Sequence, residues 1–325
     1  MSEPPEFIAH FERAVVALRD RVFAPQPIER LAAIRVFLPL AILGFLSSRL
    51  VHADDWLSSA GFHPPTLLDD WRQPLSLAPV QPVTAWLIAV AVVVAGLGTS
   101  LGVATRWTTA LFAGLLAYTS LADRLEAFTV SKLGTVLVIA LAVSPCGARY
   151  SVDAWWRHRG QPTPIVPSLC AGGSVRFFQI LIPVFYFSSG ICKATGDWLT
   201  NPYVLWTHLH DSYQTPVSLF AANHAPPWMW TVLQATTLAF EAGAPLWFGW
   251  RRTRPYAFGY GVAMHATIGL MFGPVIWFAL LMIVLLVASY APIRWLRRGA
   301  APDPVAVVPA RQGGRRSAGT AGRRR

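Results

Sequence analysis

The sequence RFFQILIPVFYFSSGICKATGDW, residues 176–198, indicates the fold class because it joins an apolar run of membrane-spanning length to a charged end. A helix needs about 20 largely apolar residues to cross the hydrocarbon core of a bilayer. Pro183 and the small residues 188–190 predict a helix that is not perfectly regular. The run delivers Lys193 to a membrane–water boundary, and Asp197 follows four residues later.

Lysine is rare in this chain, which has 27 strong bases but only two lysines, Lys132 and Lys193. An ammonium group can lose its proton when it is removed from water, whereas a guanidinium group effectively cannot. The two lysines are therefore the strong bases to consider first for proton chemistry.

The composition predicts an all-α, polytopic transmembrane helical bundle. Hydrophobic residues make up 54% of the chain and charged residues only 13%, and several apolar runs are too long for a soluble core. We expect about eight spans, near residues 31–51, 83–104, 107–122, 133–148, 176–193, 228–250, 256–272 and 274–293.

The distribution of charge predicts the orientation of these spans. The net charge of +11 comes from arginines in alternate short connections and near both ends of the chain, while the other connections are acidic or neutral. The positive-inside rule then places both termini in the cytoplasm. We expect a multi-pass protein of the bacterial inner-membrane type. The same distribution predicts the lipid bilayer as a partner and gives no reason to expect nucleic acid.

Three segments follow from this pattern. Residues 1–27 form a cytoplasmic N-terminal segment without the apolar centre of a signal peptide, so the first span directs the chain to the membrane. Residues 28–297 form the transmembrane domain. Residues 298–325 are rich in Pro, Ala, Gly and Arg without apolar periodicity, and we expect a disordered cytoplasmic tail.

Ionisable residues inside apolar spans are costly and usually face a cavity or a partner. The predicted directions of the spans bring Lys193, Lys132 and His265 to the outer half of the bundle and Glu241 near the middle. Each residue also has a structural interpretation. Lys193 anchors the helix end or pairs with Asp197, Lys132 is an interfacial anchor, Glu241 pairs with Arg35, and His265 bonds a neighbouring helix.

The sequence contains no convincing metal or redox motif. His208 and His210 lie two residues apart without a third ligand at fixed spacing, so we predict no metal site. The three cysteines, Cys146, Cys170 and Cys192, form no CxxC pair and, under the predicted topology, lie on two sides of the membrane.

Several segments together resemble the vitamin K-dependent γ-carboxylase family and its bacterial relatives, the HTTM domain proteins. The segment FYFSSGICKATGDWLTNPYVLW (185–206) matches an apolar helix followed by small–Gly–x–x–Lys and Asp-Trp. In family order, the chain also has LAAIRVFLPL (31–40), SPCGARYSVDAWW (144–156) and GVAMHATIGLMFGPVIWF (261–278).

This resemblance implies that Lys193 is a base linked to oxygenation of a reduced, vitamin K-type quinone, with O2 and CO2 as further reactants. It matches His265 to the family histidine of a later helix and makes Asp153 a structural partner. We therefore assign Lys193 and His265 as catalytic candidates. The candidates for substrate binding are Lys132, Asp197, Trp198 and Glu241.

The chain departs from the carboxylases where their fourth span begins with a histidine, because Lys132 lies there instead. The large lumenal domain of the carboxylases also has no counterpart in the sequence. Two other functions therefore stay open. One is a membrane subunit that matures a secreted peptide toxin together with a small soluble partner protein, and the other is a non-enzymatic membrane scaffold or carrier.

Overall fold

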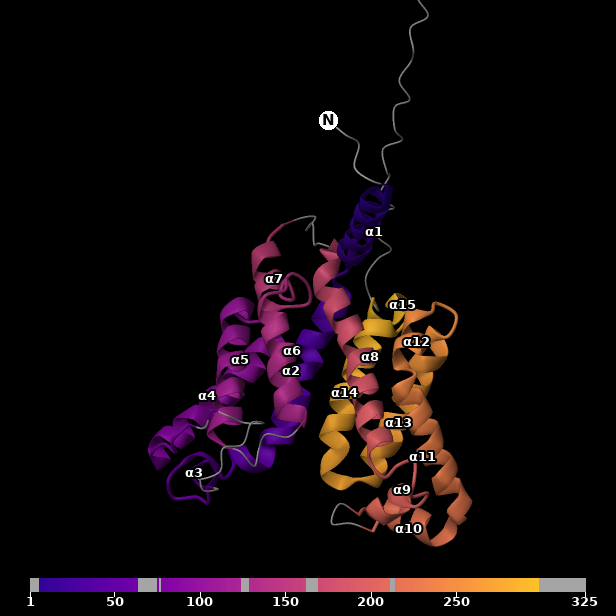
Figure 1. The fold of residues 1–325 in the computed structure, drawn as a ribbon. Coiled ribbons are helices and arrows are strands. Elements are labelled where there is room, and N and C mark those ends of the chain that lie inside the picture. The colour runs from indigo at the N-terminus through magenta and orange to yellow at the C-terminus, as the bar shows by residue number, and fades with distance from the viewer. Residues whose placement is uncertain are drawn as a thin grey trace, which may run out of the picture.

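The computed structural model describes residues 6–63, 75, 77–123, 129–161, 169–210 and 214–297, and this part of the chain is mostly helical (Figure 1). Its elements are α1 (Glu6–Phe23), β1 (Gln26–Pro27), α2 (Glu29–Leu50), α3 (Ala53–Leu57), α4 (Pro82–Leu101), α5 (Thr105–Ala122), α6 (Thr129–Ala142), α7 (Val152–His158), β2 (Leu169–Cys170), α8 (Gly172–Thr195), α9 (Val204–His208), α10 (Pro216–His224), α11 (Pro227–Ala242), α12 (Ala244–Gly249), α13 (Arg254–Met271), η1 (Gly273–Val275), α14 (Ile276–Tyr290) and α15 (Ile293–Leu296).

Helices occupy all eight predicted ranges. Within the described residues, four helical segments are long and apolar enough to cross a membrane: Glu29–Leu50, Pro82–Leu101, Gly172–Thr195 and Gly273–Tyr290. Two expected helices differ from their prediction. The fourth ends at Ala142 rather than near residue 148, because Pro145 disfavours helical backbone in the residue before it. The sixth is divided at Gly243 into α11 and α12.

The first span, α2, is the centre of the bundle. It packs against α4 and α6 on one side and α14 on the other, while α8 and α11 to α13 form the other half of the bundle (Figure 1). The short helices α3, α9 and α10 lie at the end of the bundle away from α1 (Figure 1). The position of α2 makes it the element that joins the two halves.

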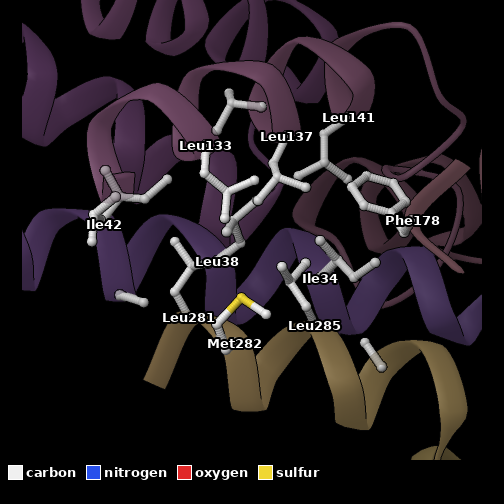
Figure 2. Packing of buried hydrophobic residues seen from close by; sticks show 14 of the residues in the cluster. Ile34, Leu38, Ile42, Leu133, Leu137, Leu141, Phe178, Leu281, Met282 and Leu285 are labelled. Carbon is white, nitrogen blue, oxygen red and sulfur yellow. The ribbon is translucent and has the colours of Figure 1, made fainter. Parts of the chain in front are cut away.

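The core around α2 is built from rows of aliphatic side chains spaced four residues apart. Figure 2 shows these rows on three helices: Ile34, Leu38 and Ile42 on α2, Leu133, Leu137 and Leu141 on α6, and Leu281 and Leu285 on α14. Rows with this spacing form the ridges that fit into the grooves of a neighbouring helix. Between helices inside a bilayer, such contacts stabilise through van der Waals packing rather than through removal of apolar surface from water.

Arg35 is a buried hydrogen-bond centre between α2 and the neighbouring connections. Its guanidinium donates to backbone carbonyls of Cys146 (3.2 Å), Thr99 (3.1 Å) and Ser100 (2.6 Å), and also to that of Tyr150. The expected pair between Arg35 and Glu241 is therefore wrong. The guanidinium is instead satisfied by carbonyls that the ends of α4 and α6 leave free.

Asp153 holds the start of α5 and makes its hydrogen bonds there. Its carboxylate accepts hydrogen bonds from the backbone of Ala104 (2.8 Å) and from the backbone and hydroxyl of Thr105 (2.7 Å each), which caps α5. Burial by itself raises the pKa of Asp153, but these hydrogen bonds outweigh it and hold the pKa below its usual value. Ser151 caps α7 by accepting from the backbone N–H of Ala154.

The N-terminal segment contains a helix that was not expected, α1, whose C-terminal end packs on the start of α8. A Cβ at Gly172 would lie 2.0 Å from the carbonyl oxygen of Ala24, so only glycine permits this approach. Strands β1 and β2 pair antiparallel beside it. The expected disordered tail, residues 298–325, lies outside the described residues.

Candidate functional site

Lys193 lies in the last turn of α8 and binds a carboxylate from α11. Its ammonium nitrogen donates to Glu241 Oε1 at 2.6 Å, to Glu241 Oε2 at 2.5 Å and to the Ser189 hydroxyl at 3.0 Å. The side chains of Lys193 and Glu241 are 24% and 7% exposed. The ion pair is thus largely removed from solvent, and Lys193 has partial access to the surface.

Gly190 allows α8 and α11 to approach closely enough for this pair. A Cβ at this buried position would lie 2.5 Å from the backbone nitrogen of Ala242 and 2.9 Å from the carbonyl carbon of Glu241. No side chain can be accommodated at these distances without separating the helices. The small–Gly–x–x–Lys motif therefore has a physical basis, since the glycine brings the second helix into reach of the lysine.

Trp198 covers the ammonium group from the following loop. The Lys193 nitrogen lies 5.0 Å from the centroid of the Trp198 ring, a cation–π geometry. Gln234, buried on α11, fixes this loop by donating to the carbonyls of Trp198 and Asn201, both at 2.8 Å. Asp197 is exposed, and Lys193 pairs with Glu241 instead, so the alternative Lys193–Asp197 pair is wrong.

His265 forms a second polar contact deeper in the bundle. Its Nε2 lies 2.8 Å from the Tyr186 hydroxyl on α8, so it bonds a neighbouring helix as its structural interpretation anticipated. Nδ1 of His265 is buried and has no hydrogen-bond partner in the described structure. Phe278 packs edge-on against the imidazole at a ring separation of 5.6 Å. A buried ring nitrogen without a partner is a candidate contact for a ligand or water.

The two polar contacts belong to one site. Tyr186 precedes Lys193 by two helical turns, a rise of about 10 Å along α8. Glu241 interacts electrostatically with Tyr186, and Lys193 with His265. The ring of Phe240, the residue before Glu241, lies 5.0 Å from that of Tyr186. Residues from α8, α11 and α13 therefore place two polar contacts one above the other between these helices, and we call this arrangement the polar column.

Other residues singled out in the sequence lie elsewhere. Lys132 is exposed on α6, whereas the column is built from α8, α11 and α13. His210 is bonded to the carbonyl of Trp206 at 2.9 Å. Within the described ranges, no group of three or more His, Cys, Asp or Glu side chains is arranged to hold a metal ion. Cys192 is exposed, whereas the other two cysteines are buried.

Three residues at or beside the site were not predicted from the sequence: Tyr186, Ser189 and Gln234. The signal was present as spacing, because Tyr186, Ser189 and Lys193 recur at i, i+3 and i+7 on one face of a helix. Gln234 and Glu241 are likewise seven residues apart on α11. Their polar character in apolar helices would have identified the face of each helix that turns towards the site.

A groove with a volume of about 730 Å³ lies between the adjacent ends of α2, α6 and α14. Its aromatic lining comes from Phe45, Trp277 and Phe278. Polar groups of Ser48 and Arg49 line it as well. Because Phe278 contacts both the groove and the imidazole of His265, the groove is adjacent to the polar column.

These features define a helical membrane protein with a buried polar site between its helices. The family model of the HTTM domain matches residues 23–295, which is most of the chain. The chain belongs to the HTTM domain family, a family of membrane proteins that includes vitamin K-dependent carboxylase-like proteins. No curated protein and no solved structure matches this sequence.

Proposed function

We propose that this protein catalyses a quinol-linked oxidative modification or carboxylation of the type carried out by vitamin K-dependent γ-carboxylases, with Lys193 as the base. The observation that carries the proposal is the short contact between the Lys193 ammonium and the largely buried Glu241 carboxylate. It gives the lysine proton an acceptor within direct reach. A secreted peptide is the proposed substrate.

Proton transfer within this pair would produce the free amine that a base requires. The Nζ–H bond breaks, an O–H bond forms on Glu241, and both side chains become neutral. Ser189 and Trp198 hold the nitrogen in place during the transfer. A neutral pair costs less than an ion pair in surroundings that exclude water, so closure of the site over a substrate favours the amine.

The groove beside His265 fits a reduced quinone. Phe45, Trp277 and Phe278 supply rings for contact with a planar head group, while Ser48 and Arg49 supply donors for its oxygens. A bound reduced quinone would supply the electrons for reduction of O2. His265, with its unpartnered Nδ1 next to Phe278, would orient or hydrogen-bond the bound group from the side of the polar column.

The proposed topology has eight crossings of a bacterial inner membrane, with both termini in the cytoplasm. Support comes from the apolar helices in all eight predicted ranges and from the arginines at one end of the bundle. In this orientation Lys193 and the groove lie in the outer half, where they are accessible to a secreted peptide.

The experiment compares Lys193→Arg with Lys132→Arg, which makes the same change at the other lysine of the chain. The measurements are quinol oxidation by the purified proteins and the mass of co-expressed secreted peptides. We expect Lys193→Arg to lower turnover at least about 100-fold, because arginine keeps the charge but cannot become a neutral base. We expect Lys132→Arg to retain activity. Equal turnover of Lys193→Arg and wild type would refute the role as base.

A non-enzymatic scaffold is a second candidate, favoured by the complete pairing of Lys193 in the described structure. In that case the pair only fastens α8 to α11. The scaffold predicts saturable binding of a small molecule or peptide without turnover, and it predicts that Lys193→Arg retains this binding.

A further inference from the structure

The last turn of α14 lies at the end of the bundle nearest α1 (Figure 1). Arginines from α2, α8 and α13 lie around this turn. Arg30 on α2 donates to two backbone carbonyls of this turn, at 2.8 and 3.2 Å. Arg176 on α8 donates to Gln179 at 2.7 Å, and Gln179 accepts a further hydrogen bond, through its backbone carbonyl, from the Tyr290 hydroxyl. Arg254 on α13 lies 6.0 Å from the centroid of the Tyr290 ring.

The positive charge of this cluster is not balanced by nearby carboxylates. Arg176 interacts electrostatically with Arg21, Arg251 and Arg254, all of the same sign. Among the described residues, none of these arginines forms an ion pair with Asp or Glu. Like charges held this close repel one another, so an anion bound among them would be stabilised.

Glu29 is the carboxylate that could have balanced the cluster, since it interacts electrostatically with Arg30. Its Oε1 already binds Arg149 and Arg297, each at 3.0 Å. The Arg30 Nε atom is buried without a partner. Glu29 Oε2 is likewise buried without a hydrogen-bond partner, and Arg254 donates to two backbone carbonyls at the end of α12, at 2.9 and 3.4 Å. Within the described part of the chain, Arg30 and Arg254 therefore have backbone acceptors but no carboxylate paired with them.

An exposed apolar stripe on α8 continues from Arg176 along the helix. Spaced at i+4, i+8, i+11 and i+15 from Arg176, its members are all exposed: Ile180, Val184, Phe187 and Ile191. Residues with this spacing lie on one face of a helix. An acyl chain that starts at Arg176 would follow this face into the bilayer.

We propose that the cluster of Arg30, Arg176 and Arg254 binds the phosphate of an anionic phospholipid in the leaflet at this end of the bundle. Arg176 and Arg254 provide half-buried guanidinium donors beside Tyr290, and the stripe on α8 receives one acyl chain. Arg21 and Arg251 add long-range attraction. The lipid would hold α8 against α13 and α14 about 25 Å from Lys193 along α8.

The test measures lipid retention by the full chain after purification, using native mass spectrometry with phosphatidylglycerol or phosphatidylcholine as the probe. We expect wild type to bind phosphatidylglycerol at least tenfold more tightly than phosphatidylcholine. The variant Arg176→Gln with Arg254→Gln should lose this preference. The control Arg106→Gln, which removes an exposed arginine at the start of α5, should keep it.

A second variant keeps the test decisive if the first fails to fold. Arg21→Gln with Arg251→Gln changes only exposed side chains, and we expect it to weaken phosphatidylglycerol binding several-fold at low salt and less at high salt. Equal retention of the two lipids by wild type, or the same loss in Arg106→Gln, would overturn the proposal. Competition by inorganic phosphate as effective as that by the lipid would show a site for a soluble anion instead.

Discussion

At the residue scale, the Lys193–Glu241 pair contributes to stability as well as to the proposed chemistry. Removing one partner of a buried pair leaves the other charge uncompensated, which costs more than the net contribution of the pair. We expect Glu241→Leu to lower the free energy of unfolding by about 2–3 kcal/mol, because the partial exposure of Lys193 moderates the penalty. Thermal unfolding of the purified protein measures this change.

The double variant Lys193→Met with Glu241→Leu tests the same explanation from the other side. It replaces both charges with apolar groups of similar size, so it should recover most of the stability that Glu241→Leu loses. If the double variant loses as much unfolding free energy as the sum of the losses in Lys193→Met and Glu241→Leu, the two side chains contribute independently. Activity should stay absent in either case if Lys193 is the base.

Single residues could be identified from the sequence where chemistry is scarce, but their partners could not. Lys193 and His265 stood out because ionisable groups are rare in apolar helices. Glu241 was recognised and given the wrong partner, since depth along a helix does not reveal which neighbouring helix the side chain faces. Whether Glu241 pairs with Arg35 or Lys193, and whether Lys193 pairs with Asp197 or Glu241, depends on how closely α8 and α11 approach each other.

At the element scale, Gly190 sets that approach, and Gly190→Ala tests it. The new Cβ would lie 2.5 Å from a backbone nitrogen, so α8 and α11 must move apart and lengthen the contact between Lys193 and Glu241. We expect a loss of about 1–3 kcal/mol in stability, together with lower activity. Gly259→Ala is the matched control, because its Cβ meets nothing within 4 Å and helix propensity favours alanine. Stability at least equal to wild type in Gly190→Ala would contradict the close-contact explanation.

The capping of α5 by Asp153 gives a prediction for pH. The hydrogen bonds from Ala104 and Thr105 hold the pKa of Asp153 below its unfolded value, so the carboxylate stabilises the fold at pH values above the unfolded pKa. This contribution is lost as the pH falls through the lower, folded pKa. Asp153→Asn should cost about 1 kcal/mol at pH 7 and flatten the loss of stability in acid. Unfolding measured from pH 7 down to pH 3 checks this, and parallel curves for variant and wild type would refute it.

The helices that could be predicted from the sequence are those that hydropathy alone marks out. Apolar runs located the helices of the bundle, because length and apolarity are local properties of the sequence. Helix α1 was not predicted because its mean hydropathy is low, although Phe11, Val15 and Leu18 recur with helical spacing. The division at Gly243 was not predicted either, since glycine is tolerated in apolar helices and its effect depends on Trp247, which occupies the space of its Cβ.

At the scale of the whole molecule, the proposed function requires that the polar column and groove open to the outer face. The proposed orientation rests on the arginines concentrated at the end opposite Lys193. A labelling experiment with a membrane-impermeant maleimide tests it. The two buried cysteines, Cys146 and Cys170, give little background, and Cys192→Ser removes the exposed one.

In this Cys192→Ser background, Thr200→Cys should react in intact spheroplasts because it is exposed just beyond the end of α8. Arg251→Cys, exposed after α12, should react only in inverted vesicles, and so should Arg106→Cys at the start of α5. The two arginine sites lie in different halves of the bundle, so their agreement requires an even number of crossings between them. If Thr200→Cys and Arg251→Cys react from the same side, α11 and α12 together do not cross the membrane. If Thr200→Cys reacts only in inverted vesicles, Lys193 lies at the cytoplasmic surface, and a secreted peptide could not reach it.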